Sequence, residues 1–383
     1  MKTPCIIANL AKIKENARYI LAACEKSGVT LAAVTKVVCA HEPIVEALIE
    51  AGVLMLADAR AQNLARLPRT LPRLSLRPSD PMMADETIEN SEYSLQSEVK
   101  TISALGLAAR GLEKQHGVIL LIDLGDLREG LYHRDREGIM DLARAVSREP
   151  WLKMEGVGTN LTCFGGILPD DHNLGALIEI AQTLRRELNL PIPIVSGGNS
   201  SSLHLLFEGR LPAGINHLRV GEGLLLGRDT AHGRPFPFLH QDAFTLAASL
   251  VEVQDKPSKP EGTSGPNAFG EYVEFPDLGP MRRGILAIGR QDTDAEGLHP
   301  KDERVKILGA SSDHLIVDLS RAPEYQVGDA LAFTPDYGAL LKAYTSPYVY
   351  REREEDEWTR FWWWRWAATP FSEKEERPPL QSS

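Results

Sequence analysis

The stretch Leu31-Ala32-Ala33-Val34-Thr35-Lys36-Val37 is a continuous apolar run that carries one lysine near its end. Such a short run predicts a strand that is buried on both faces, as in a parallel sheet. A lysine inside it is costly unless it is paired, neutralised or used covalently. Burial lowers the pKa of a lysine, which is what Schiff-base chemistry requires. On this motif alone, the favoured alternative is a lysine that extends from the strand end to solvent.

Similar runs alternate with helix-like segments through the first 230 residues or so of the chain. The strand candidates are Leu31–Val37, Val53–Ala57, Arg73–Leu76, Glu92–Leu95, Gly117–Leu124, Glu155–Asn160, Ile192–Ser196 and His217–Val220. Between them, segments such as Leu174–Leu188 have apolar residues near a 3.6-residue period. This alternation predicts the α/β class and a TIM-like (β/α)₈ barrel, with a doubly wound open sheet as the alternative. In a barrel, Lys36 would face the active site, because strand C-terminal ends do.

The pattern changes near Ala243, where short β-like runs separated by turn residues replace the helix-like segments. We predict a barrel domain over residues 1–242, whose first strand can instead join a C-terminal all-β domain over residues 243–348. A charged tail over residues 349–383 follows. Five of the six tryptophans lie in its part from 351 to 383, which is either a terminal extension or a surface that packs on a neighbouring subunit.

Composition limits the partners of this chain of 383 residues. The formal net charge of −11 argues against nucleic acid and anionic membranes as partners, because both need a basic face. The four cysteines have irregular spacing, so neither a disulfide framework nor a metal site is expected. No signal peptide or membrane-spanning run is recognised. The expected location is therefore the cytoplasm, with reduced thiols.

Three motifs follow strand candidates and can carry chemistry. Gly197-Gly198-Asn199-Ser200-Ser201-Ser202 offers backbone N–H groups and hydroxyls for a phosphate, although an ordinary glycine-rich turn has the same composition. Arg219-Val220-Gly221-Glu222-Gly223 ends the last barrel strand, where phosphate sites are common. Asp123-Leu124-Gly125-Asp126-Leu127-Arg128 ends the fifth strand, and Arg128 either contacts substrate or pairs with a neighbouring aspartate.

The order of these motifs resembles the fold-type III, alanine racemase-like family of pyridoxal-phosphate enzymes. The segments that carry the resemblance include Ala33-Val34-Thr35-Lys36, Gly158-Thr159-Asn160, Gly198-Asn199-Ser200, Arg219-Val220-Gly221 and Ala343-Tyr344-Thr345-Ser346-Pro347. Within the family, the chain is most similar to the branch of ornithine racemases and related racemases. Phrases such as Asn160-Leu161-Thr162-Cys163-Phe164-Gly165-Gly166 and Gly309-Ala310-Ser311-Ser312-Asp313-His314 carry that likeness.

The resemblance implies a cofactor, a site and an assembly. Pyridoxal 5′-phosphate would form a Schiff base with Lys36. The implied cofactor contacts are Lys36, Asn199, Ser200, Arg219, Gly221, Glu222 and Tyr344. The implied substrate contacts are Arg128, Asn160, Ser312 and Asp313. The enzyme would be a head-to-tail homodimer with its active sites at the interface, and no metal is implied.

One departure from the family concerns the second proton-transfer group. In alanine racemases this group is a tyrosine from the partner's β domain, but Phe269 precedes Gly270 in the comparable segment here. Cys163, after strand six, is the barrel-side candidate, because a thiol with a suitable pKa transfers protons. Its alternative is a small buried hydrophobic residue. Asp313 and Tyr272 are the other candidates.

The resemblance predicts racemisation of a free amino acid, ornithine or another basic or small one, in D-amino acid metabolism. Acidic residues such as Asp292, Asp294 and Asp313 also suggest a basic substrate. One alternative is a non-catalytic pyridoxal-phosphate protein, against which the β domain argues. Others are a lyase or decarboxylase on the same scaffold, or a phosphate-binding barrel without this cofactor.

Overall fold

A computed structural model describes residues 2–354 of the chain, which fall into two units. One unit runs from Ala11 to Gln241, and the other combines the residues up to Leu10 with the chain from Asp242 onward. We call them the barrel unit and the β unit, and each is described by itself.

The barrel unit is a closed ring of eight parallel strands. Its strands are β2 (Thr30–Val34), β3 (Met55–Asp58), β4 (Arg73–Ser75), β5 (Tyr93–Gln96), β6 (His116–Asp123), β8 (Leu152–Gly158), β9 (Ile194–Ser196) and β10 (His217–Val220). Neighbours pair in the order β5-β4-β3-β2-β10-β9-β8-β6, and pairing of β5 with β6 closes the ring. The expected (β/α)₈ barrel is therefore confirmed, and each of its strands overlaps a predicted run.

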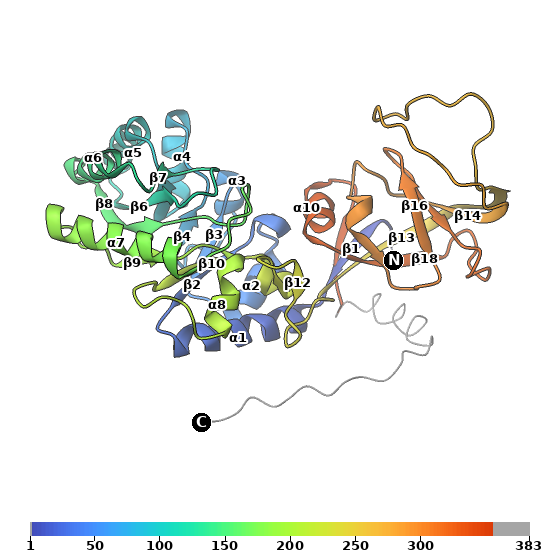
Figure 1. Ribbon diagram of the computed structural model, residues 1–383, viewed down its shortest axis with the longest axis horizontal. Coiled ribbons are helices and arrows are strands. Elements are labelled where there is room, and N and C mark those ends of the chain that lie inside the picture. The colour runs from blue at the N-terminus through green and yellow to red at the C-terminus, as the bar shows by residue number, and fades with distance from the viewer. Residues whose placement is uncertain (1, 355–383) are drawn as a thin grey trace. The chain divides into compact units, whose positions relative to one another are not determined.

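Helices surround this ring (Figure 1). They are α1 (Leu10–Lys26), α2 (Glu42–Glu50), α3 (Ala61–Leu64), α4 (Ala84–Asn90), α5 (Val99–Gly111), α6 (Arg136–Arg148), α7 (Asp171–Leu188), α8 (Leu203–Phe207) and α9 (Glu222–Leu226). Helix α7 shows why such segments are helical. A capping box at Asp170 and Asn173 starts it, and an apolar stripe that includes Leu177 and Leu184 is buried in the core.

The barrel unit also contains two-residue strands in addition to the eight strands of the ring. β7 (Leu131–Tyr132) pairs with β6, and β11 (Arg228–Asp229) forms a small antiparallel ladder with β12 (Arg234–Pro235). None of these strands was predicted, because two residues are too few to show a period.

The β unit is built on an antiparallel sheet. Its strands are β1 (Cys5–Ala8), β13 (Phe244–Pro257), β14 (Pro280–Leu286), β15 (Leu298–Pro300), β16 (Lys306–Ala310), β17 (Leu315–Asp318), β18 (Ala330–Pro335) and β19 (Tyr350–Arg353). The main path is β15-β18-β13-β14-β17-β16, while β1 pairs antiparallel with β13 and parallel with β19. The N-terminal strand therefore lies in the β unit, which was one of the two expectations.

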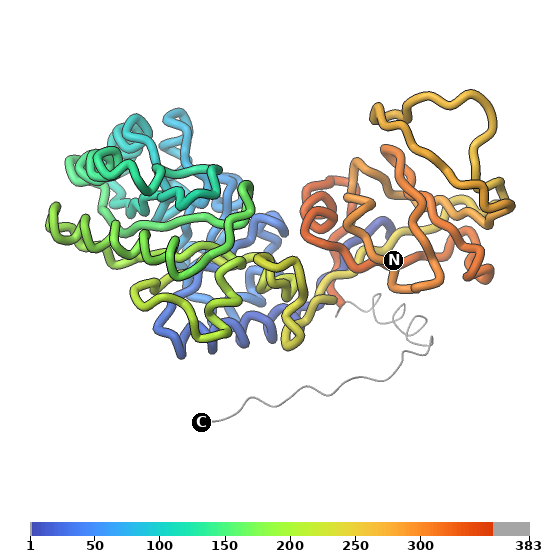
Figure 2. The backbone as a smooth tube through the Cα atoms, in the orientation of Figure 1, coloured from blue at the N-terminus to red at the C-terminus, as the bar shows by residue number. Residues whose placement is uncertain are grey.

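The β unit differs in detail from what its sequence predicts. Among residues 2–354, the β unit contains the helix α10 (Tyr337–Thr345) in addition to its antiparallel sheet. The polar segment from Val251 to Pro257 is strand, because β13 and β14 form a long antiparallel ladder there. The loop that follows makes a wide excursion between the two strands (Figure 2). β19 begins two residues after the predicted domain end at residue 348, and the tryptophan cluster lies outside the described residues.

Among the helices of residues 2–354, none is long and apolar enough to cross a membrane.

Candidate active site

Lys36 lies immediately beyond the C-terminal end of β2, in a short turn of 3₁₀ helix. The side chain is half-buried, and it makes no hydrogen bond or ion pair with any other residue between 2 and 354. Burial is the main cause that lowers the pKa of Lys36, and the nearby Arg128 guanidinium lowers it further. An amine with a lowered pKa at the catalytic end of a barrel strand suits covalent attachment to a carbonyl group.

A buried carboxylate fixes the backbone next to this lysine. Thr35 donates its hydroxyl to Asp58 at the end of β3, with 2.8 Å between the oxygens. Asp58 is fully buried and also accepts hydrogen bonds from Asn63 Nδ2 at 3.1 Å and from the Arg60 amide at 3.0 Å. Sequence reasoning missed Asp58, because its pairing with Thr35 exists only once β2 and β3 lie side by side.

Arg219 is the other buried cation of the barrel end. It belongs to β10, has an exposed fraction of only 2%, and burial lowers its pKa to about 10. Its Nη1 donates to Ser196 Oγ at 2.5 Å, and its Nη2 donates to the Thr159 carbonyl at 2.5 Å and to Asn160 Oδ1 at 2.8 Å. Since this pKa stays far above neutral, Arg219 remains a cation at physiological pH.

Arg128, Glu129 and Asn160 extend this network toward solvent. Arg128 donates two hydrogen bonds to Glu129, from Nε to Oε2 and from Nη2 to Oε1. Asn160 Nδ2 donates to the same Oε1 at 2.5 Å. Three of the predicted residues, Arg128, Asn160 and Arg219, therefore belong to one hydrogen-bonded network. Glu129, which links them, was missed, although its position beside Arg128 was a visible signal.

The glycine-serine turn lies after β9, where the sequence analysis expected it. Ser200 Oγ accepts hydrogen bonds from the amides of Gly221 at 3.3 Å and Gly223 at 3.1 Å, which ties the turn to the end of β10. A Cβ at Gly221 would lie 3.1 Å from Val34 Cβ on β2. Small residues therefore let the ends of β9, β10 and β2 meet closely, beside Asn199 and Glu222.

Cys163 lies in the loop after β8, near three cations. Its sulfur accepts a hydrogen bond from Asn199 Nδ2 at 3.2 Å. It interacts electrostatically with Lys36, Arg128 and Arg219. Although the residue is exposed in part, burial raises the pKa of the thiol, and Arg128 and Lys36 only partly oppose this.

Asp126 fixes the loop that carries Cys163. This buried carboxylate accepts hydrogen bonds from the amides of Cys163 at 3.1 Å, Phe164 at 2.8 Å and Ile167 at 3.2 Å. From the sequence, Asp126 was expected only as a partner of Arg128. Its observed role depends on a loop about 40 residues away, which no local motif reveals.

The remaining predicted residues belong to the β unit. Tyr344 is fully buried on α10, and its ring lies under the guanidinium of Arg351 at 5.6 Å. Ser312 donates to the exposed Asp313 at 2.6 Å, and Tyr272 is 79% exposed. Asp292, one of the acids expected to favour basic substrates, is buried and accepts a hydrogen bond from Ser346 at 2.7 Å.

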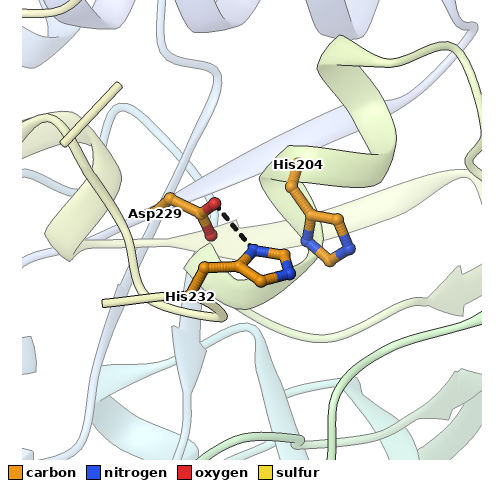
Figure 3. A group of neighbouring side chains, drawn as sticks. All are labelled: His204, Asp229 and His232. Atoms are coloured by element: carbon orange, nitrogen blue, oxygen red, sulfur yellow. Dashed lines mark hydrogen bonds and ion pairs between the residues drawn. The ribbon is translucent and has the colours of Figure 1, made fainter. Parts of the chain in front are cut away.

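A cluster of potential metal ligands occurs elsewhere in the barrel unit. His204, Asp229 and His232 bring ligand atoms within 4.8 Å of one another (Figure 3). The Asp229 carboxylate, however, already accepts from His232 Nδ1 at 2.9 Å and Arg234 Nε at 3.3 Å, and His204 Nδ1 donates to the Ser201 carbonyl at 2.7 Å. We interpret these contacts as hydrogen bonds and an ion pair that stabilise the β11–β12 hairpin.

The chain is similar to known proteins over most of its length. A family model described as the alanine racemase N-terminal domain matches residues 8–229. The chain is 44% identical over 352 residues to an ornithine racemase of Acetoanaerobium sticklandii, covering 91% of this chain and 99% of that protein. It is 36% identical over 354 residues to a lysine racemase of Thermotoga maritima, covering 91% and 98%.

Solved structures share the fold at lower identity. An alanine racemase from Bacillus anthracis matches with a TM-score of 0.70 and 18% identity, covering 93% of this chain and 96% of that one. An alanine racemase from Streptomyces coelicolor matches with a TM-score of 0.69 and 20% identity, covering 92% and 98%.

Proposed function

This chain belongs to the alanine racemase family as an amino acid racemase, and from that premise we propose that it racemises a basic amino acid, with ornithine the first to test. The support for a basic substrate is that both curated relatives are named for one, ornithine in the first and lysine in the second. Each is covered almost completely by this chain, so the comparison includes the whole catalytic region.

Pyridoxal 5′-phosphate is the proposed cofactor, and the residues at the barrel end fit it. The observation that carries the proposal is Lys36, a half-buried amine with a lowered pKa and no paired partner among residues 2–354. When bound there, the cofactor supplies an electron sink that acidifies the α-proton of an amino acid. The task of Lys36 is to hold the cofactor and then to accept or return that proton on one face.

The proposed cofactor contacts divide between phosphate and ring. Asn199 and Ser200 lie in the glycine-serine turn, and Gly221 and Glu222 lie at the end of β10 to which Ser200 is hydrogen-bonded. Backbone amides and hydroxyls of this kind suit a phosphate. Tyr344 is proposed to contribute from the β unit. Arg219 would face the ring nitrogen. A guanidinium that stays charged donates hydrogen bonds, so it would keep that nitrogen unprotonated and limit side reactions such as transamination.

Inversion at a carbon requires proton transfer on two faces, so a second group is needed. We propose Cys163, because its sulfur lies near Lys36, Arg128 and Arg219 and is held by Asn199. Tyr272 and Asp313 are the alternatives from a partner's β unit. Arg128 and Asn160 are proposed substrate contacts in the barrel, and Ser312 with Asp313 in the β unit. The proposal includes a head-to-tail homodimer and a cytoplasmic location.

The test is a chiral assay of the purified protein against single enantiomers of ornithine, lysine, arginine, alanine and serine. We expect D-ornithine to form from L-ornithine and the reverse, with lysine next. A protein that inverts alanine but neither ornithine nor lysine would contradict the basic-substrate proposal.

Lys36→Ala tests the cofactor anchor. It should lower racemisation by roughly 10⁴-fold or more and abolish the borohydride-reducible adduct with pyridoxal phosphate. The matched control is Lys153→Ala, since Lys153 is an exposed lysine of the same barrel on β8. A reducible adduct that survives in Lys36→Ala would assign the anchor to another lysine.

A further inference from the structure

Glu129 occupies a turn whose path is fixed by the end of β6. At Gly130 the backbone has a φ of +117°, and a Cβ there would lie 2.8 Å from the Asp123 amide nitrogen. Only glycine allows this close return of the chain. The turn therefore holds Glu129 at the catalytic end of the barrel, with a side chain that is only 22% exposed.

The carboxylate of Glu129 holds one edge of Arg128. Nε and Nη2 of Arg128 donate to the two oxygens of Glu129, which is the two-point geometry that matches a guanidinium to a carboxylate. Nη1 makes no hydrogen bond to any residue between 2 and 354. The guanidinium therefore has one edge filled by Glu129 and a second edge, formed by Nη1 and Nη2, that can receive another carboxylate. Its side chain is 37% exposed, so a ligand can reach it.

The same carboxylate reaches Arg219 through Asn160. Asn160 donates its Nδ2 to Glu129 Oε1 at 2.5 Å and accepts at Oδ1 from Arg219 Nη2 at 2.8 Å. The amide can satisfy both neighbours in only one orientation, because an anion needs its nitrogen and a cation needs its oxygen. The orientation of Asn160, and with it one contact of Arg219, thus depends on the negative charge of Glu129.

Glu129 also partly balances the positive charge at the barrel end. Lys36, Arg128 and Arg219 carry like charges in one region, and all three interact with Glu129. Burial alone would lower the pKa of Arg128, but the hydrogen bonds to Glu129, together with the charges of Cys163, Glu129 and Asp126, raise it. For Lys36, Arg128 lowers the pKa while Glu129 raises it. Removal of this carboxylate would leave the three cations less compensated.

We propose that Glu129 is a positioning residue that holds Arg128 so that its open edge binds the α-carboxylate of the substrate, and that holds Arg219 through Asn160. This inference rests on the proposed function, because it assumes an amino acid as ligand. It assigns a role to a residue that does not itself touch the reacting atoms.

The experiment compares two ligands of the cofactor-loaded enzyme by isothermal titration calorimetry. One ligand is 5-aminopentanoate, which has the carboxylate and side chain of ornithine but no α-amino group to react. The other is 1,4-diaminobutane, which has the amines but no carboxylate. The variants are Glu129→Gln and Glu129→Asp. Glu187→Gln is the matched control, because Glu187 also pairs with the arginine that precedes it, on the exposed surface of α7.

In Glu129→Gln we expect binding of 5-aminopentanoate to weaken roughly tenfold, since a charge-assisted contact that positions Arg128 is lost. Binding of 1,4-diaminobutane should change less than twofold. KM for ornithine should rise by a similar factor of about ten, with a smaller change in kcat. Glu129→Asp should recover part of the loss, and Glu187→Gln should match the wild type. Equal weakening of both ligands would overturn the proposal.

A double-mutant cycle keeps the inference testable if one variant is unstable. Arg128→Lys removes the two-edged guanidinium but keeps the charge. If Glu129 acts through Arg128, adding Glu129→Gln to Arg128→Lys should cause little further loss of 5-aminopentanoate binding. Additive losses would refute the coupling.

The substrate proposal can fail separately from this inference. If the wild type racemises an amino acid other than ornithine, the ornithine proposal falls, and the comparison uses the α-deamino analogue of that amino acid. Carboxylate-selective loss in Glu129→Gln would still support the positioning role, whereas unchanged binding of that analogue would refute it.

Discussion

At the scale of single residues, the barrel end combines groups that sequence could identify with groups that it could not. Lys36 was predictable, because a lysine in an apolar strand needs an explanation and the family resemblance supplied one. Arg219 and the turn at Asn199 were found in the same way. Glu129 and Asp58 were not, since their importance lies in partners from other strands. The type of a residue indicates which chemistry it can perform. Its hydrogen-bond partners from distant parts of the chain are known only from the folded structure.

We predict that Cys163 donates a proton to the substrate. Burial raises the pKa of its thiol, so the group is protonated at neutral pH and suits proton donation. Cys163→Ala should lower kcat/KM by roughly 10²-fold or more. It should also slow α-proton exchange in D₂O more for one enantiomer than for the other. Cys24→Ala, which removes a thiol buried in α1, should affect both enantiomers equally. Equal, near-wild-type exchange in Cys163→Ala would eliminate it as the second group and direct attention to Tyr272 or Asp313.

At the scale of elements, continuous apolar runs predicted the barrel strands because parallel strands covered on both faces carry little polar sequence. The same pattern does not reveal β19, which lies beyond the predicted end of the β domain at residue 348. The described part of β19 is polar and exposed on most residues, and it is a strand because it pairs with β1. Strand pairing of this kind depends on a distant segment, so a local pattern cannot reveal it.

We predict opposite effects on stability when alanine replaces a glycine in a barrel strand and a glycine in a helix. A Cβ at Gly156 on β8 would lie 2.3 Å from the Ile194 carbonyl oxygen on β9, so Gly156→Ala forces two barrel strands apart. It should lower the free energy of unfolding by about 2–3 kcal/mol. Gly175→Ala is the control, because Gly175 lies within α7 and a Cβ there meets nothing within 4 Å. That change should raise stability by about 0.5–1 kcal/mol. Urea unfolding of both variants measures the difference, and equal stabilities would contradict the steric argument.

At the scale of the whole molecule, two buried histidines couple the stability of the barrel unit to pH. Burial is the main cause that lowers the pKa of His116 to about 4 and that of His217 to about 3. In the unfolded chain both have a pKa near 6.5. The unfolded state therefore binds these protons first as pH falls, so stability is complete above about pH 6.5 and is lost progressively below it.

Between pH 7 and pH 5, each of these histidines should lower the free energy of unfolding by about 2 kcal/mol. His116 is the first residue of β6, and its Nε2 bonds to Ser94 Oγ on β5 at 2.8 Å, so His116→Gln removes its share of the pH dependence. Denaturant titrations at the two pH values should give a wild-type loss larger than the variant's by about 2 kcal/mol. Equal losses would mean that His116 takes up its proton in the folded state.

The parallel pairing of β1 with β19 has a consequence for how the chain is made. The partner of Cys5 is Tyr350, and the barrel unit is encoded between them. At ribosomal rates of about 5–20 residues per second, β1 waits for tens of seconds after it is synthesised before its last neighbour exists. The barrel unit, whose eight ring strands all lie between residues 30 and 220, can close in that interval. Ile6 and Ile7, buried in the finished protein, have no neighbouring strand until β13 is synthesised and lack their second one until β19 follows.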